Sequence, residues 1–286
     1  MNVITIQILL IACLVSLACT IPGTFLVLRG VSLMSDAISH AILPGIVLMF
    51  FVVHQLDSPF LIVGAALAGL ATVVCTEVII YTQCLRKDAA IGIVFPLFFS
   101  VGVILIGQFA RNVHLDTDMV LLGELAFAPF HRLIVGGVDY GPIAAWTMSG
   151  VVLLNIIFVA LFYKELKLIT FDYDFARVIG CRPLAVYYGL MLIASITTVG
   201  AFDAVGAIVV VALMIVPAAT ARLMTDRLLP LLLLSGATGI TAAMSGYSFA
   251  RWADVSIAGS IALACGFLFM CAFGLHLFGN SRNAFK

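Results

Sequence analysis

Residues 32–53 read Ser-Leu-Met-Ser-Asp-Ala-Ile-Ser-His-Ala-Ile-Leu-Pro-Gly-Ile-Val-Leu-Met-Phe-Phe-Val-Val, an apolar stretch that contains one carboxylate and one imidazole. Its length matches the roughly 20 residues that a helix needs to cross the hydrocarbon core of a bilayer. Asp36 and His40 are four residues apart, so on a helix they lie on the same face, one turn from each other. An ionisable side chain at membrane depth costs roughly 2.5–3.5 kcal/mol or more, and it normally faces a bundle interior or a water-filled path. We therefore expect a membrane-spanning helix whose polar face has a function.

This predicted polar face is narrow. Ser32 and Ser39 fall within about 60° of Asp36 on a helical wheel. The opposite face is apolar and carries Met34, Ala37, Ile38, Ala41 and Ile42. Aspartate together with histidine is a ligand set that suits manganese, iron or zinc. Each residue also has a structural alternative to metal binding. The Asp36 carboxyl would form a hydrogen bond with the backbone or a serine, and the His40 nitrogens would have hydrogen-bond partners in the protein core.

The composition is that of an integral membrane protein. Of 286 residues, 64% are hydrophobic and only 10% are charged, whereas a soluble domain is about 25% charged. Fourteen basic residues balance fourteen acidic ones, so the chain lacks the basic surface that nucleic-acid binding requires. The lipid bilayer, and no nucleic acid, is the predicted environment.

The hydropathy pattern predicts an all-α, polytopic helical bundle with eight or nine transmembrane helices in a single domain over residues 1–286. The nine candidate spans are 4–28, 32–53, 60–82, 89–109, 143–163, 184–201, 205–222, 228–248 and 255–278. With the N-terminus outside, eleven of the fourteen basic residues fall on the cytoplasmic side, as the positive-inside rule requires. The alternative count of eight arises because 184–222 is almost continuously apolar.

Two connections between spans are long. Residues 110–142 are predicted to lie outside, and within them Val120–Phe130 is apolar enough to dip into the membrane interface or pack on the bundle. This outer segment also contains polar residues that either pass metal inward or serve as hydrated docking residues, namely His114, Asp116 and Asp118.

Residues 164–183 form the second long connection and are predicted to lie inside. Asp172 would cap a short helix there, Asp174 suits its first turn, and Gly180 would end it. The spacing of Phe171, Phe175 and Ile179 gives this helix an apolar edge. That edge either contacts a partner or packs on the protein's own bundle.

Three motifs, taken in order, resemble one known family. They are Leu28-Arg-Gly-Val-Ser-Leu-Met-Ser-Asp-Ala-Ile-Ser-His-Ala-Ile-Leu-Pro-Gly45, Lys87-Asp-Ala-Ala-Ile-Gly-Ile-Val-Phe95 and Val205-Gly-Ala-Ile-Val-Val-Val-Ala-Leu-Met-Ile-Val-Pro-Ala-Ala-Thr-Ala-Arg222. Together they resemble the membrane permeases of bacterial ABC importers for manganese, zinc and chelated iron (the ABC-3 family). The resemblance extends from about residue 10 to residue 275. One departure is Asp254-Val-Ser-Ile-Ala-Gly-Ser at the start of the last span, where many relatives have a Pro-x-Gly motif.

The resemblance implies a multi-pass permease of the bacterial inner membrane, similar to type II ABC importers. It implies a second permease copy or a paralogue, a pair of cytoplasmic ABC ATPases, and an extracytoplasmic metal-binding protein that delivers the ion. The chain itself would be no enzyme and would hold no permanent cofactor. Manganese, iron or zinc would be cargo, and ATP would bind the partner. The outer segment His114–Phe127 looks more like the manganese and iron branch than the zinc branch.

Individual positions also acquire roles from the resemblance. Asp36 and His40 match the positions proposed to handle metal in the pathway. The segment Phe171–Gly180 matches the coupling helix that docks on the ATPase, and its expected contact residues are Asp172, Asp174, Phe175, Arg177 and Gly180.

The residues themselves agree with an externally driven transporter. The sequence contains no G-x-x-x-x-G-K-[ST] phosphate loop, so energy must come from a partner or from a gradient. One Asp and one His supply only two ligands, and a two-fold dimer would supply four around one axis. Glu77 lies roughly 13 Å from Arg86 along its helix, where it is either a further pathway group or part of a structural bond to a neighbouring helix.

We therefore expect an ATP-driven importer of manganese or iron. The alternatives are a zinc importer of the same type and an ATPase-independent secondary transporter, which would not need a docking helix. An intramembrane enzyme is disfavoured because neither H-E-x-x-H nor G-x-S-x-G occurs in the sequence.

Overall fold

Nine helices in the described part of the chain are long and apolar enough to cross a membrane. The computed structural model describes residues 3–54, 60–109, 125–135, 138–180 and 182–283, without the side chains of Phe109, Val135, Val138, Tyr173, Asp174 and 278–283. The nine are α1 (Val3–Leu28), α2 (Leu33–Val53), α3 (Phe60–Tyr81), α4 (Lys87–Phe109), α6 (Ile143–Leu161), α9 (Pro183–Val205), α10 (Ala207–Met224), α11 (Leu228–Ala253) and α12 (Ile257–Asn283).

The predicted spans match these helices to within a few residues at nearly every boundary. The largest differences are at the ends of α9, α11 and α12, which run four or five residues beyond their predicted ends. Hydropathy reports only the apolar part of a helix. The helical hydrogen bonds of α11 continue through more polar residues such as Ser248 and Arg251, so the helix is longer than its apolar run.

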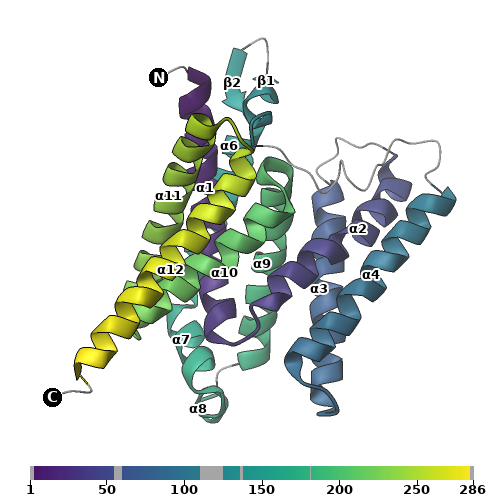
Figure 1. Ribbon diagram of the computed structural model, residues 1–286. Coiled ribbons are helices and arrows are strands. Elements are labelled where there is room, and N and C mark those ends of the chain that lie inside the picture. Colours follow the sequence, from purple (N-terminus) through teal and green to yellow (C-terminus); the bar gives the residue numbers. More distant parts are fainter. Residues whose placement is uncertain (1–2, 55–59, 110–124, 136–137, 181, 284–286) are drawn as a thin grey trace.

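The helices form two groups that contact each other mainly through α9 (Figure 1). One group is α2, α3 and α4, in which α2 packs on both of the others. The second group is α1, α6 and α9–α12. Two short helices, α7 (Tyr163–Phe171) and α8 (Tyr173–Val178), lie at the same end of the molecule as the C-terminus, and the N-terminus lies at the opposite end. We name the α7–α8 end the basic end, because Lys164, Lys167 and Arg177 lie on it.

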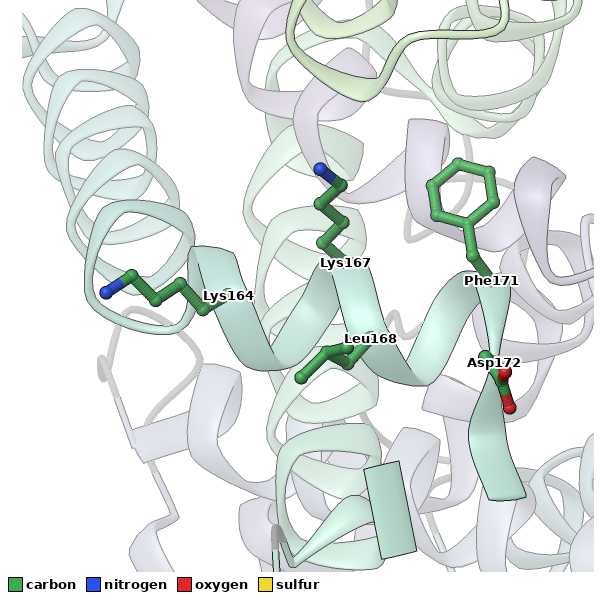
Figure 2. A pocket seen from close by; sticks show the side chains of 5 residues that line it. All are labelled: Lys164, Lys167, Leu168, Phe171 and Asp172. Carbon is green, nitrogen blue, oxygen red and sulfur yellow. The ribbon is translucent and has the colours of Figure 1, made fainter. Parts of the chain in front are cut away.

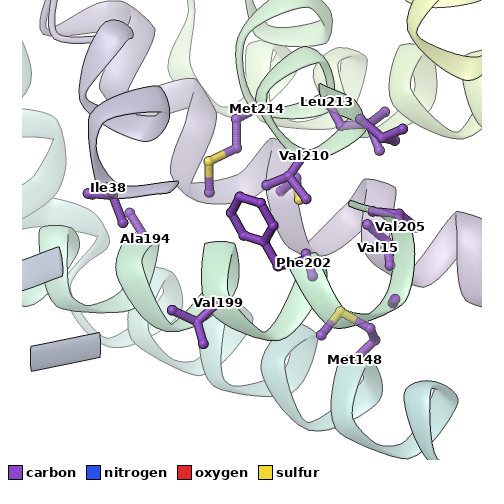
Figure 3. Packing of buried hydrophobic residues seen from close by; sticks show 14 of the residues in the cluster. Val15, Ile38, Met148, Ala194, Val199, Phe202, Val205, Val210, Leu213 and Met214 are labelled. Atoms are coloured by element: carbon purple, nitrogen blue, oxygen red, sulfur yellow. The ribbon is translucent and has the colours of Figure 1, made fainter. Parts of the chain in front are cut away.

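The main hydrophobic core lies where α1, α9 and α10 meet (Figure 3). Val15 of α1, Phe202 of α9 and Met214 of α10 are buried there. A second cluster at the basic end consists of Phe25, Leu166, Ile169, Ala176, Val186, Leu190 and Leu228. Because Leu166, Ile169 and Ala176 belong to α7 and α8, this cluster fixes both short helices to the bundle.

Small and polar residues join the helices inside the bundle. A Cβ added to Gly45 of α2 would clash with the carbonyl oxygen of Gly64 on α3, so the two backbones touch at this crossing. The fully buried Asn155 of α6 donates from Nδ2 to the Ala18 carbonyl (2.9 Å) and to Thr197 Oγ1 (3.0 Å). Asn155 therefore holds α6 against α1 and α9, which is the interhelical role that small polar side chains have in membranes.

The segment before α6 contains a small β-hairpin that the hydropathy pattern did not predict. A 3-10 turn, η1 (Ala128–Phe130), precedes strands β1 (Arg132–Val135) and β2 (Val138–Pro142), which pair antiparallel. Leu125 and Ala128 are buried, and η1 contacts α1 and α6. Residues 125–130 therefore pack on the bundle, which is one of the two arrangements that we expected for this segment. The other expected outer residues, His114, Asp116 and Asp118, lie outside the described residues.

Candidate functional site

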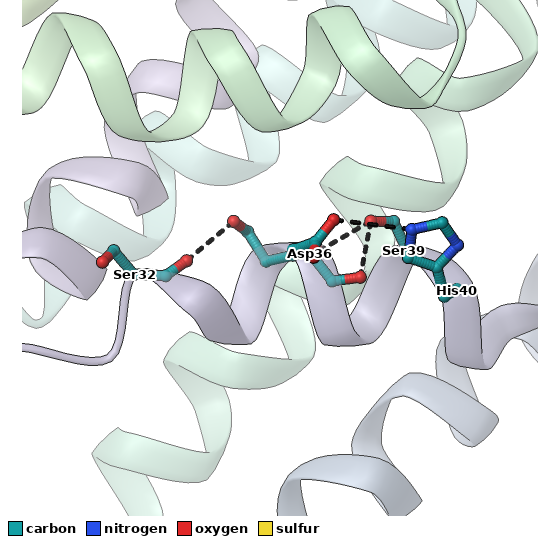
Figure 4. A network of polar contacts seen from close by, with 5 residues as sticks. Ser32, Asp36, Ser39 and His40 are labelled. Atoms are coloured by element: carbon teal, nitrogen blue, oxygen red, sulfur yellow. Dashed lines mark hydrogen bonds and ion pairs between the residues drawn. The ribbon is translucent and has the colours of Figure 1, made fainter. Parts of the chain in front are cut away.

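Helix α2 brings Asp36 and His40 together on one face, as their spacing predicts (Figure 4). His40 Nε2 lies 3.5 Å from Asp36 Oδ1. The side chains of His40 and Asp36 are 34% and 41% exposed, whereas Ala37, Ile38, Ala41 and Ile42 between and beside them are buried. The pair thus sits on the open side of a helix whose apolar face is covered by its neighbours.

Two neighbouring serines, Ser35 and Ser39, do not extend this open side, whereas Ser32 is partly exposed. Ser39 is fully buried, and its Oγ donates to the carbonyl oxygens of Ser35 (3.0 Å) and Asp36 (2.8 Å). Ser35 Oγ donates to the Ser32 carbonyl. A helical wheel places Ser39 near Asp36, but it does not show that α2 packs against other helices on that side. The exposed polar face is therefore narrower than predicted at Ser39, and it consists of Asp36, His40 and the partly exposed Ser32.

Two phenylalanines of α4 flank the imidazole of His40. The ring centroids of Phe95 and Phe99 lie 5.6 Å and 6.0 Å from that of His40. These contacts restrict the orientations that the imidazole can adopt. Sequence reasoning missed both residues, although their four-residue spacing is the signal that places them on one face of α4.

One chain does not supply a complete set of metal ligands at this place. Among the described residues there is no group of three or more His, Cys, Asp or Glu side chains that could hold a metal ion. Asp36 and His40 offer one oxygen and one nitrogen ligand, fewer than the four to six that transition metals usually bind. Any complete site here needs ligands from a second copy, from water or from another protein.

Glu77 has a partner on another helix. Tyr187 of α9 donates a hydrogen bond from Oη to Glu77 Oε1 at 2.5 Å. We had expected Glu77 to be either a group in the metal pathway or part of a structural bond to a neighbouring helix, and this hydrogen bond matches the second alternative. Nothing in the sequence links the two residues, which are 110 positions apart.

The segment after α6 folds as two short helices rather than the single helix that we predicted. The Asp172 side chain caps α8 by accepting a hydrogen bond from the Phe175 backbone nitrogen at 2.9 Å, which confirms its predicted capping role. Helix α8 ends at Val178, and Gly180 follows with a φ of +85°, a conformation that favours glycine. Asp174 lies in the first turn of α8 as predicted, and its side chain is outside the described residues.

The outer face of α7 and α8 combines exposed apolar and charged side chains. Phe171, Phe175 and Ile179 are each at least half exposed. Figure 2 shows a hollow beside α7 lined by Lys164, Lys167, Leu168, Phe171 and Asp172. The two short helices therefore pack on the bundle through one face, and the apolar edge that the sequence indicated lies on the other.

Comparison with known proteins identifies the family. The ABC 3 transport family matches residues 1–276. The chain belongs to this family. Manganese transport system membrane protein MntD of Bacillus subtilis is 44% identical over 260 residues, which cover 91% of this chain and 88% of that protein. Zinc transport system membrane protein TroD of Treponema pallidum is 47% identical over 265 residues, which cover 93% of this chain and 72% of that protein.

A solved structure supports the same assignment. A chain of PsaBC from Streptococcus pneumoniae, solved in complex with a Fab, superimposes with a TM-score of 0.77 at 30% identity, covering 95% of this chain and 91% of that one. The resemblance drawn from the three motifs is thus confirmed, as is the multi-pass helical fold. As a member of the ABC 3 transport family, the chain is a membrane-embedded permease subunit.

Proposed function

We propose that this chain is the permease subunit of an ATP-driven importer of divalent transition metal ions, with manganese or zinc as the cargo. Relatives that share more than 40% of its residues are named for manganese or for zinc; iron, which the motifs also suggest, remains a prediction. The observation that carries the proposal is the Asp36–His40 pair, 3.5 Å apart and open on one side of a spanning helix. Carboxylate and imidazole ligands suit both manganese and zinc.

The metal site is completed by a second permease copy or a paralogue. Asp36 and His40 are partly exposed in the single chain, and a charged group facing hydrocarbon is unfavourable. A second copy placed against this face removes the pair from lipid and contributes another carboxylate and imidazole. Four such ligands around a two-fold axis form a low-affinity way-station, which suits conduction because the ion must also leave.

The energy comes from an ABC ATPase dimer that docks on α7 and α8. Phe171, Phe175 and Ile179 are exposed at the basic end, outside the apolar helices, and a cluster of exposed apolar residues in water marks an interaction surface. Asp172, Asp174, Arg177 and Gly180 complete the contact that we expect. A gradient-driven transporter does not need this surface. We therefore favour ATP-driven transport over gradient-driven transport.

The proposed orientation follows from the charges. The basic end faces the bacterial cytoplasm, in keeping with the positive-inside rule, and the opposite end receives the metal from an extracytoplasmic binding protein. Closure of the ATPase subunits moves α7 and α8, and the two permease copies rock as rigid bodies so that the Asp36–His40 site faces each side in turn.

Metal uptake by cells that lack this chain tests the proposal. Expression of the wild-type chain, together with its ATPase, is expected to restore uptake of radioactive manganese or zinc, and competition among manganese, zinc and iron identifies the cargo. His40→Ala is expected to abolish uptake while the ATPase still co-purifies. His276→Ala is the matched control, because it removes an exposed histidine at the basic end. Normal uptake by the His40→Ala variant would overturn the proposed site.

A further inference from the structure

A chain of contacts at the basic end links α7 and α8, which we call the docking segment (residues 163–178), to helix α3. Arg29 Nη1 donates to the Ile169 carbonyl oxygen of α7 at 3.5 Å. The guanidinium carbon of Arg29 lies 4.4 Å from the ring centroid of Tyr187 on α9. Tyr187 Oη in turn donates to Glu77 Oε1 on α3 at 2.5 Å. The contacts thus run from α7 through Arg29 and Tyr187 to α3.

Two of the three contacts in this cluster are of the stronger kinds, whereas the bond from Arg29 to the Ile169 carbonyl is long. A hydrogen bond between a hydroxyl and a carboxylate is charge-assisted, and a guanidinium over an aromatic face is attracted by the ring. Tyr187 is 4% exposed, and Arg29 and Glu77 are partly buried. Burial strengthens both interactions because there is little water to compete with them.

The position of Arg29 connects this cluster to α2, the helix that carries Asp36 and His40. Arg29 directly follows α1, and only Gly30, Val31 and Ser32 separate it from the first residue of α2. Ile169, whose carbonyl oxygen accepts from Arg29, is buried in the cluster that fixes α7 to the bundle. A shift of α7 therefore acts on the turn that begins α2 and, through Tyr187, on α3.

Helix α3 belongs to the same group as α2, on which it packs closely. Closer to the middle of the two helices, α9 and α3 share a further hydrogen bond, from Ser195 Oγ to the Ala66 carbonyl at 3.2 Å. The Tyr187–Glu77 bond adds an attachment on the side nearest the docking segment. When α7 moves, this attachment makes α3 follow α9.

We propose that Arg29, Tyr187 and Glu77 form a positioning cluster that transmits movement of the docking segment to the α2–α4 group, and that Glu77 acts there rather than as a metal ligand. The inference rests on the proposed function, since it takes α7 and α8 to dock an ATPase. None of the three residues needs to touch the ion. The three residues instead influence the number of ATP molecules that are hydrolysed for each ion transported.

The test uses the full permease–ATPase complex reconstituted in liposomes, with metal uptake and ATP hydrolysis measured on the same sample. Tyr187→Phe removes only the Oη atom, and we expect it to lower the number of ions carried per ATP by about tenfold, within the range of allosteric couplings. Tyr188→Phe, which removes the same atom from the next position of α9, is expected to leave this ratio unchanged.

Two variants of Glu77 separate a positioning role from a ligand role. Glu77→Gln keeps an oxygen that accepts from Tyr187 and is expected to retain most of the coupling, whereas Glu77→Ala is expected to match Tyr187→Phe. The double variant Glu77→Ala/Tyr187→Phe is expected to be no worse than either single one. Metal binding at Asp36 and His40 should be unchanged throughout.

Two results would overturn the inference. The first is a ratio of ions to ATP in Tyr187→Phe equal to that in Tyr188→Phe. The second is loss of uptake in Glu77→Gln with normal uptake in Tyr187→Phe, which assigns Glu77 to the metal path. Failure of the proposed function is recognised separately, because the wild-type complex would then carry no metal or His40→Ala would carry it normally.

Discussion

At the scale of single residues, the geometry around His40 explains how the orientation of one imidazole is restricted. Asp36 lies 3.5 Å away on the same helix, and Phe95 and Phe99 flank the ring from α4. The phenylalanines offer no polar atom, so they restrict the ring without occupying the imidazole nitrogens that we propose bind the metal. Hydrogen-bonded groups that orient a metal ligand contribute about 10–100-fold to metal affinity or activity, and we expect the two rings to contribute at the lower end of that range.

We predict that Phe99→Ala lowers metal uptake by about tenfold, because the imidazole loses a neighbour that restricts its orientation. The measurement is initial uptake rate against metal concentration in cells that express equal amounts of protein. Phe98→Ala is the control, since the next residue on a helix points about 100° away. Equal loss of uptake in both variants would mean that general packing of α4, rather than the orientation of His40, is responsible.

Asn155 gives a second prediction at this scale. Asn155→Ala removes its hydrogen bonds to the Ala18 carbonyl and to Thr197, and we expect it to destabilise the protein by about 1 kcal/mol, the usual size of an interhelical hydrogen bond in a membrane. Unfolding of the purified chain in mixed micelles measures the effect. Ser149→Ala, an exposed position on the same helix, should leave stability unchanged, and a similar change in both variants would argue against the interhelical role.

At the scale of elements, the crossing of α2 and α3 depends on glycine. A Cβ on Gly45 would clash with the Gly64 carbonyl oxygen and would lie 2.6 Å from the Ala68 Cβ, so at least one of the two helices must shift. We predict that Gly45→Ala destabilises the protein by roughly 1–3 kcal/mol, the usual cost of overpacking. Gly150→Ala on α6 places a Cβ where nothing lies within 4 Å and is the control in the same unfolding experiment. Wild-type stability of Gly45→Ala would show that the helices do not cross so closely.

The docking segment gives a prediction about assembly. Phe175→Ala removes an exposed apolar side chain from α8, and we expect it to weaken binding of the ATPase by at least about tenfold, because buried aromatic anchors carry much of the energy of an interface. Co-purification of the ATPase at increasing dilution measures this. Phe249→Ala, which removes an exposed ring from α11 near the opposite end, should leave binding unchanged. If the Phe175→Ala variant binds the ATPase as tightly as the wild type does, Phe175 and α8 are not part of the contact.

At the scale of the whole molecule, the sequence was sufficient for those features that depend on neighbouring residues. Hydropathy located the spans, and the four-residue spacing placed Asp36 beside His40. Features that depend on packing between distant segments were not predictable. Tyr187 and Glu77 meet although they are 110 positions apart, and the covered position of Ser39 follows from the helices that pack on α2.

The β-hairpin and helix α7 were missed for a related reason. Both are short elements in connections between spans, where a hydropathy pattern of about 20 residues carries little information. Helix α7 is recognisable only once Leu166 and Ile169 are seen to be buried against the bundle. The predicted cap at Asp172 and the glycine after α8 depended on local backbone chemistry, and both were confirmed.

We propose that Asp36 and His40 from two permease copies together hold the transported ion, and Mn²⁺ EPR of the assembled permease–ATPase complex detects that ion and its ligands. We predict a saturable signal from one Mn²⁺ per two permease chains, with hyperfine coupling to imidazole nitrogen, and the loss of this signal in His40→Ala. An unchanged signal and stoichiometry in His40→Ala would contradict the claim.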